Sequence, residues 1–229
     1  MVISNCGMFA GPCREVYVSA LAQPQAELKK AYVIIPIDPS IPPGDLQFAE
    51  YATELMRALN DNGYHPAETV EKAEIVIYMG YAISQPQEHT FTGTQTEYGF
   101  TDTTSKTTAT SGFKTVDATT HSSTYGPTGT STTTSIVTTY RRSLLISAAD
   151  AGILHAAANG DADAKAKNPE LWRETVTSEG SNGDLREIMP TLIYAASTQF
   201  AQNSHAALLN RIRAKDENVS YIMTGERKK

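Results

Sequence analysis

The sequence has 229 residues, a formal net charge of −6 and a pI near 5.4, which fits one domain or one domain with large insertions. Charged residues make up only 19% of the chain, which argues against a disordered linker, since such linkers usually carry high net charge. The acidic balance excludes the basic surface that binds nucleic acid or anionic lipid, and the sequence has no apolar run of about 18 residues that could span a bilayer as a helix.

The N-terminal segment, residues 1–30, has no sustained hydrophobic period and is predicted to be a tether. Residues 2–7, VISNCG, read like the end of a lipoprotein signal peptide, although the charged region and apolar stretch of a complete signal are missing. Cys6 is therefore a candidate lipid acceptor. The alternatives are a disulfide between Cys6 and Cys13, or two free thiols. The lipid and the disulfide both imply export.

The next segment has the pattern of a β-α-β unit. Residues 31–37, AYVIIPI, form a short β-branched run that is typical of a buried strand. From Asp45 apolar residues recur at helical spacing, and Gly63 supplies the left-handed residue that ends this helix. A second apolar run covers residues 74–83. The two strands are predicted to lie parallel, joined by a right-handed crossover.

Residues 88–135 differ in composition from the rest of the chain, because between Thr90 and Tyr140 there are 21 Thr and 6 Ser in 51 residues. Thr is β-branched and prefers extended backbone. Alternate Thr residues of two runs each fall on one face of a strand: Thr90, Thr92, Thr94 and Thr96, then Thr128, Thr130, Thr132 and Thr134. These two ladders predict an ordered arm of two or four strands, built as a long β-hairpin, in which hydroxyls and methyls pair across strands. The alternative is a disordered, low-complexity loop.

The remainder of the chain is predicted to return to the domain. Residues 136–147 form a strand with Arg142 near an edge or end, residues 153–169 a surface insertion, and residues 171–177 the fourth strand. Asp184 caps a last helix, which either kinks at Pro190 or begins just before it. The apolar stripe of this helix contains Leu185, Ile188, Met189, Leu192, Ile193, Ala196 and Phe200.

These elements predict the fold class α+β. A mixed four-stranded sheet with two helices on one face forms a single domain over residues 31–229. The Thr-rich hairpin arm is inserted between the second and third strands. At about 25 cal/mol per Å² of buried apolar surface, a domain of this size needs no disulfide or metal to be stable.

Several local strings resemble the family of small bacterial envelope lipoproteins catalogued as domain of unknown function 4136. They are the helix end at Asn62-Gly63-Tyr64, the Thr run 130–134, the turn at Asp150-Ala151-Gly152 and the strand start 171–175, LWRET. The likeness covers roughly residues 30–205. Here 18 residues, 153–170, separate the turn from the Trp strand, and Glu174 replaces the family's Gly. The resemblance implies an exported lipoprotein, often anchored to the outer membrane, and brings no catalytic residues.

The sequence lacks a pattern that would carry chemistry. The five histidines share no spacing that binds metal: His65, His89, His121, His155 and His205. No Gly-rich phosphate loop follows a strand, and Asp161 and Asp163 lack the further oxygen ligands of a calcium loop. Trp172 is predicted to pack in the core. The sequence therefore predicts no enzyme, no cofactor and no metal site.

Two functions follow from this reading. The favoured one is a non-catalytic structural or interaction protein of the cell envelope that assembles with itself, or with an envelope complex, through its arm. The alternative is a periplasmic binding or accessory module that recognises peptide, glycan or lipid on its sheet face. Either protein would reside in the periplasm, with an outer-membrane anchor if Cys6 is acylated, or at the cell surface.

Overall fold

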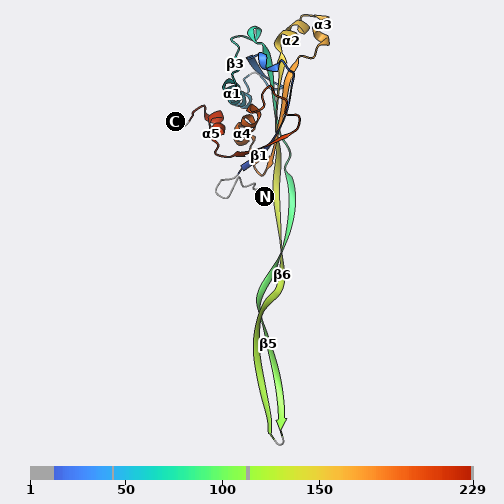
Figure 1. Ribbon diagram of the computed structural model, residues 1–229, viewed down its shortest axis with the longest axis vertical. Helices are drawn as coiled ribbons and strands as arrows, with labels where there is room; N and C mark the ends of the chain where they lie inside the picture. Colours follow the sequence, from blue (N-terminus) through green and yellow to red (C-terminus); the bar gives the residue numbers. More distant parts are fainter. Residues whose placement is uncertain (1–12, 43, 112–113, 228–229) are drawn as a thin grey trace. The chain divides into compact units, whose positions relative to one another are not determined.

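The computed structural model describes residues 13–42, 44–111 and 114–227. Across these residues the chain forms eight β-strands and five α-helices, with short 3-10 helices at Ala26–Leu28 and Val70–Lys72. The chain divides into two compact units (Figure 1). The body comprises Met1–Gln87 and Thr138–Lys229, and the arm comprises Glu88–Val137.

The body is built on a sheet with the strand order β3-β2-β4-β6-β7-β1-β8. Its strands are β1 (Cys13–Ala22), β2 (Ala31–Pro36), β3 (His65–Pro66), β4 (Ile75–Ile83), β6 (Lys114–Asp150), β7 (Glu170–Gly180) and β8 (Leu208–Arg213). β2 pairs in parallel with β3 and β4, and every other neighbour on this path is antiparallel. The predicted parallel pairing of the two strands of the β-α-β unit is thus confirmed.

Each α-helix begins directly after an aspartate whose carboxylate accepts a hydrogen bond from a backbone N–H of the first turn. The helices are α1 (Leu46–Asp61), α2 (Ala151–Ala158), α3 (Ala162–Ala166), α4 (Leu185–Ser197) and α5 (Glu217–Thr224), capped by Asp45, Asp150, Asp161, Asp184 and Asp216. Such caps satisfy amide groups that the helix itself leaves unbonded. Gly63, just after α1, has a φ of +77°, as predicted for the residue that ends this helix.

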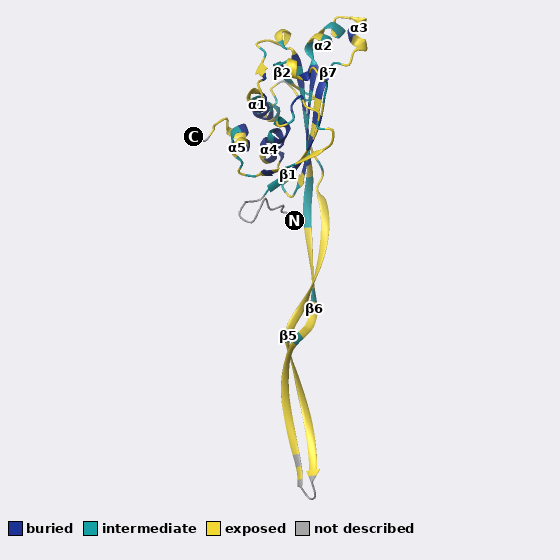
Figure 2. Ribbon diagram, in the orientation of Figure 1, coloured by how far each residue is buried: buried dark blue, intermediate teal, exposed yellow. Residues whose placement is uncertain are grey.

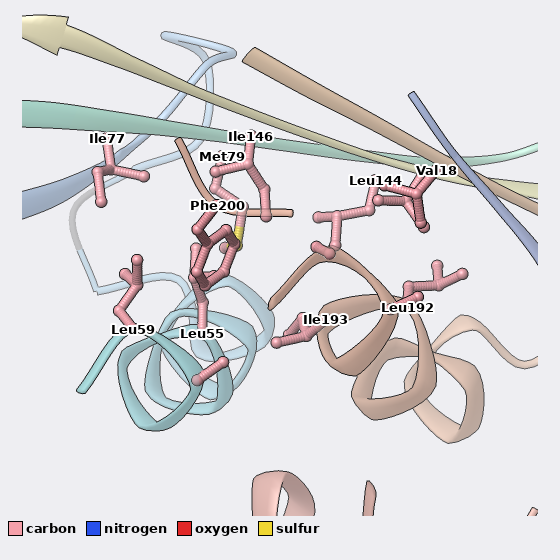
Figure 3. Packing of buried hydrophobic residues seen from close by; sticks show 14 of the residues in the cluster. Val18, Leu55, Leu59, Ile77, Met79, Leu144, Ile146, Leu192, Ile193 and Phe200 are labelled. Carbon is pink, nitrogen blue, oxygen red and sulfur yellow. The ribbon is translucent and has the colours of Figure 1, made fainter. Parts of the chain in front are cut away.

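The core lies between α1, α4 and one face of the sheet (Figure 3). Leu55 and Leu59 of α1 and Leu192 and Ile193 of α4 are fully buried. They pack in one cluster with side chains from the strands, among them Val18, Ile77, Met79, Leu144, Ile146 and Val176. Phe200 closes the cluster beside Trp172, with ring centroids 5.6 Å apart. The apolar stripes read from the two helical segments therefore form one core.

The predicted fold class is wrong. The structure is a mixed sheet of eight strands with five helices, whereas the sequence reading gave four strands and two helices. β1 lies in the segment expected to be a tether, and it is held between β7 and β8 by backbone pairing. β8 and α5 follow the last predicted helix. α2 and α3 occupy the segment expected to be a surface insertion, and α4 begins at Leu185 and continues through Pro190.

The second face of the sheet has a different character. In β1, Val16, Val18 and Ala20 are buried while the alternating residues Tyr17 and Ser19 are exposed, as expected for a strand with one covered face. Tyr17 lies opposite Leu209 of β8, and both side chains are exposed. This face therefore carries apolar side chains outside the core.

Candidate functional site

The arm is a hairpin formed by β5 (Gln87–Ser111) and the first part of β6. Almost every described residue of the arm is exposed, and none is buried (Figure 2). The described arm therefore has no core of its own. A two-stranded hairpin in water is at best marginally stable, because too little apolar surface leaves the solvent.

The eight threonines expected to form the assembly arm divide between its two strands. Thr90, Thr92, Thr94 and Thr96 lie on β5, and Thr128, Thr130, Thr132 and Thr134 lie on β6. All eight side chains are exposed. Thr128 Oγ1 donates a hydrogen bond of 3.4 Å to the carbonyl oxygen of Glu97. Among the described residues no side-chain hydrogen bond joins one Thr ladder to the other, so the two strands are held here by backbone pairing.

The outer half of the arm has a regular register. Ser123 Oγ donates a hydrogen bond to Asp102, Thr104 Oγ1 lies 3.0 Å from His121 Nδ1, and Thr110 Oγ1 lies 3.4 Å from Thr115 Oγ1. From one pair to the next, the residue number on β5 rises by as much as the residue number on β6 falls, as expected for antiparallel strands without a bulge. Because side chains alternate between the faces of a strand, these six residues lie on one face of the hairpin.

Three aromatic side chains gather on the arm. The ring centroids of Tyr98 and Tyr125 are 6.2 Å apart in a stacked arrangement, and Phe100 meets Tyr125 edge-on at 5.1 Å. Their exposed fractions are 61%, 63% and 71% for Tyr98, Tyr125 and Phe100. These contacts stabilise the hairpin but leave most of each ring in water.

Arg142 lies inside the body, although the sequence suggested a position near an edge or end. It sits on β6 between Ile83 of β4 and Ser178 of β7, and only 3% of it is exposed. Its guanidinium donates to the carbonyl of Asn182 at 3.1 Å and to Ser178 Oγ at 3.4 Å. A Cβ at Gly180 would lie 2.8 Å from Nη2, so the glycine makes room for this group. Burial, and next the nearby Arg14, lower the pKa of Arg142.

Glu174 is a second buried polar residue, and its burial was not predicted from the sequence. It lies on β7 between Ile146 of β6 and Ala20 of β1, and it is 1% exposed. Neither carboxyl oxygen has a hydrogen-bond partner within the described structure. Burial raises the pKa of this carboxyl well above its usual value. The signal was present in the sequence, since Glu174 shares the period-two parity of the buried Trp172 and Val176.

Tyr64 and Trp172 form an aromatic contact in the same core. Their ring centroids are 6.4 Å apart, and the Tyr64 hydroxyl is likewise without a partner in the part of the chain described. Burial, and next the Glu174 carboxyl, raise the pKa of Tyr64 to about 12. Trp172 is 1% exposed, so the prediction that it packs in the core is confirmed. These residues lie in the interior rather than at a surface site.

Cys13 at the start of β1 is disulfide-bonded. Cys6, the other cysteine of the sequence and the candidate lipid acceptor, lies outside the described residues. A disulfide at Cys13 is compatible with the alternative in which Cys6 and Cys13 form a disulfide, and not with two free thiols.

The structure offers few ligands for a metal ion. Within residues 13–42, 44–111 and 114–227, no three His, Cys, Asp or Glu side chains gather in a way that could hold one. None of the helices described is long and apolar enough to cross a membrane.

Comparisons with known proteins give little. No family model matches the chain, and neither does any curated protein. Among solved structures, the chain is similar to a PDZ domain protein from Parabacteroides distasonis, with 11% identity and a TM-score of 0.34. The match covers 81% of this chain but 36% of that one, so the chain spans about a third of the length of that protein. A likeness at this TM-score supports no inference about function.

Proposed function

We propose that this chain is a non-catalytic structural or interaction protein of the cell envelope, and that it assembles with further copies of itself or with an envelope complex through its arm. The observation that carries the proposal is the arm itself, a long hairpin in which almost every described residue is exposed. A hairpin of this kind lacks burial of its own and becomes stable when a partner covers it.

The edges of the arm support the same proposal. Exposed strand edges are usually protected by charged side chains or proline. From Glu88 to Tyr140 the sequence has one proline, Pro127, and six charged residues, namely Glu88, Glu97, Asp102, Lys106, Lys114 and Asp117. Long edges with so little protection are suited to pair with another strand. If the partner is a second copy, head-to-tail pairing closes a ring or continues as a filament.

Deletion of the arm is the direct test. Gln87 and Thr138, the residues of the body that flank the arm, can be joined by a short Gly-Ser linker. We expect this variant to keep the folded body, measured by circular dichroism and thermal melting, and to lose assembly, measured by size exclusion with light scattering. An unchanged oligomeric state would show that assembly does not depend on the arm.

Export is supported by the disulfide at Cys13, since disulfides persist in oxidising compartments. We propose a periplasmic or cell-surface location, in line with the resemblance to envelope lipoproteins catalogued as domain of unknown function 4136. An outer-membrane anchor would follow if Cys6 carries lipid. A lipid on the Cys6 sulfur would leave Cys13 to pair with a cysteine of another molecule, because the sequence has two cysteines.

Mass spectrometry of the intact protein from its native host separates the two states of Cys6. We expect an unreduced protein that resists thiol alkylation and that takes up two alkyl groups after reduction. A mass increased by two or three acyl chains would instead establish the lipid anchor, with Cys13 then in an intermolecular disulfide. A protein alkylated twice without reduction would contradict the disulfide and remove its support for export.

A second candidate function uses the uncovered face of the sheet. Tyr17, Leu21 and Leu209 are large apolar residues exposed there, with exposed fractions of 44%, 52% and 42%. Such residues favour a binding or accessory module that holds a peptide, glycan or lipid on this face. Under this alternative the arm-deleted protein would retain its ligand, whereas Tyr17→Ala would weaken binding.

A further inference from the structure

The outer half of the arm has two faces of different chemistry. The face that carries the Asp102–Ser123 and Thr104–His121 contacts also carries every charged and aromatic residue between residues 100 and 125, outside the tip at 111–114. By the alternation of strands it contains Phe100, Asp102, Thr104, Lys106, Thr108, Thr110, Thr115, Asp117, Thr119, His121, Ser123 and Tyr125. We name it the charged face.

The opposite face carries short, uncharged side chains. It contains Thr101, Thr103, Ser105, Thr107, Ala109, Ala118, Thr120, Ser122 and Thr124, all of them exposed. We name it the hydroxyl face. The hydrogen bond from Ser122 Oγ to the carbonyl of Thr103, at 3.5 Å, lies here. The side-chain to side-chain bonds of the outer arm all lie on the charged face, within the residues that the structure describes.

We infer that the hydroxyl face is the surface on which a second copy of this chain packs, arm against arm. The inference rests on the proposed function and adds to it which face of the arm is used.

The occupant follows from charge and hydrogen-bonding complementarity. Two identical faces can meet only if the surface complements itself. A hydroxyl both donates and accepts a hydrogen bond, so one Thr or Ser array can satisfy another, while the Thr methyls and the two alanines pack together. A charged side chain facing its own copy would be repelled. The whole chain has a net charge of −6, so an acidic contact face would be repelled by its copy. The residues named on the hydroxyl face carry no charge, so this repulsion does not arise there.

The opposite orientation is less favourable. Packing the charged face against a partner would take Asp102, Asp117 and Lys106 out of water, and burying a charge without a well-placed partner is costly. Exposed on the outer side of the assembly, the same residues remain solvated and limit further stacking. A two-sided arm of this kind buries one face in the same way as an amphipathic strand pair does in a sheet.

Neighbouring threonines provide a matched test in the full-length protein. Thr107→Lys places a charge on the hydroxyl face, and Thr108→Lys places the same charge one residue away on the charged face. We expect Thr107→Lys to weaken self-association roughly tenfold or more, since like charges would meet across the contact, and Thr108→Lys to leave it within about twofold. Analytical ultracentrifugation over a concentration series measures both.

A second pair on the other strand uses the opposite sign of charge. Thr120→Glu should weaken association like Thr107→Lys, whereas Thr119→Glu, which lies across from Lys106, should not. Circular dichroism checks that each variant retains its strands. The inference is overturned if the Thr108 and Thr119 variants are as weak as the Thr107 and Thr120 variants, or if all four associate normally. If all four associate normally while deletion of the arm abolishes assembly, the proposed function stands and only the choice of face fails. A monomeric wild-type protein would overturn this inference and the self-assembly part of the proposed function, and would leave assembly with an envelope complex.

Discussion

Replacing Leu192 with alanine is expected to lower the free energy of unfolding by about 2–5 kcal/mol. Leu192 is fully buried on the inner side of α4, within the cluster that joins both helices to the sheet. Truncation removes three buried carbon atoms of the side chain. It leaves a cavity that close-packed core residues such as Leu144 and Val18 cannot fill without moving. Urea or guanidinium unfolding followed by circular dichroism measures the loss.

Thr132→Ala is the control for this experiment. Thr132 is exposed on β6 in the arm, outside the core cluster, so its loss should cost well under about 1 kcal/mol. Equal destabilisation by the two substitutions would mean that the arm contributes to the core as much as α4 does. A cost for Leu192→Ala below about 1 kcal/mol would show that the core between helix and sheet is packed differently.

Elements with strong local signals could be predicted from the sequence. The strands β2 and β4 are predictable because each is a short run of apolar, mostly β-branched residues. The helix between them is predictable because it combines a helical period with a capping residue, Asp45, and an end signal, Gly63. The helix after Asp184 was found for the same reasons, and its N-cap bond to Arg186 is formed. Local patterns of this kind do not depend on distant partners.

Strands that depend on distant partners were missed. β1 has clear alternation, with Val16 and Val18 inward, but its polar residues gave no buried run to detect. Its register is set by β7 and β8, whose paired residues lie 150 or more positions further along the chain. Leu208, Leu209 and Ile212 have a spacing in the sequence that also suits a helix. The open edge of β1 instead holds them in a strand, where long-range pairing overrides local propensity.

The candidate site was accessible to sequence reasoning only in outline. The composition of residues 88–135 indicated an arm, and the structure forms a hairpin over that segment. The two faces of the arm could not be separated without the register, because a shift of one residue exchanges the faces. The contacts Asp102–Ser123 and Thr104–His121 supply that register.

The buried carboxyl of Glu174 should make the body less stable as the pH rises. Its pKa is raised in the folded protein by burial, so the folded state keeps a proton that the unfolded chain has released. The contribution of Glu174 to the free energy of unfolding is therefore fully present below the ordinary glutamate pKa of 4.5. Above that pH the contribution falls progressively, until the carboxyl of the folded protein also ionises. One proton corresponds to a slope of up to about 1.4 kcal/mol per pH unit.

Glu54 acts in the same direction. Burial, and next the neighbouring Glu50, raise its pKa to about 8, against the opposing charges of Arg57 and Arg186. Its contribution should fall between about pH 4.5 and pH 8 and then level off. Glu74 has the opposite sign, because backbone N–H groups of Ala31 and Lys30 donate to its carboxylate and lower its pKa. Stability from Glu74 is lost only as the solution becomes acidic.

Glu174→Gln should remove the larger part of the loss at high pH, because the amide is neutral and has nearly the shape of the protonated acid. We expect the variant to unfold at higher denaturant concentration than the wild type at pH 8, and the difference to shrink towards pH 5. Glu226→Gln, at an exposed position, should leave the pH dependence unchanged. If the wild type and the Glu174 variant show parallel stability curves from pH 5 to pH 8, then Glu174 is ionised in the folded protein and must have a charged or hydrogen-bonding partner. Glu174→Gln with Glu54→Gln should flatten the curve further, because burial raises the pKa of both carboxyls in the folded protein.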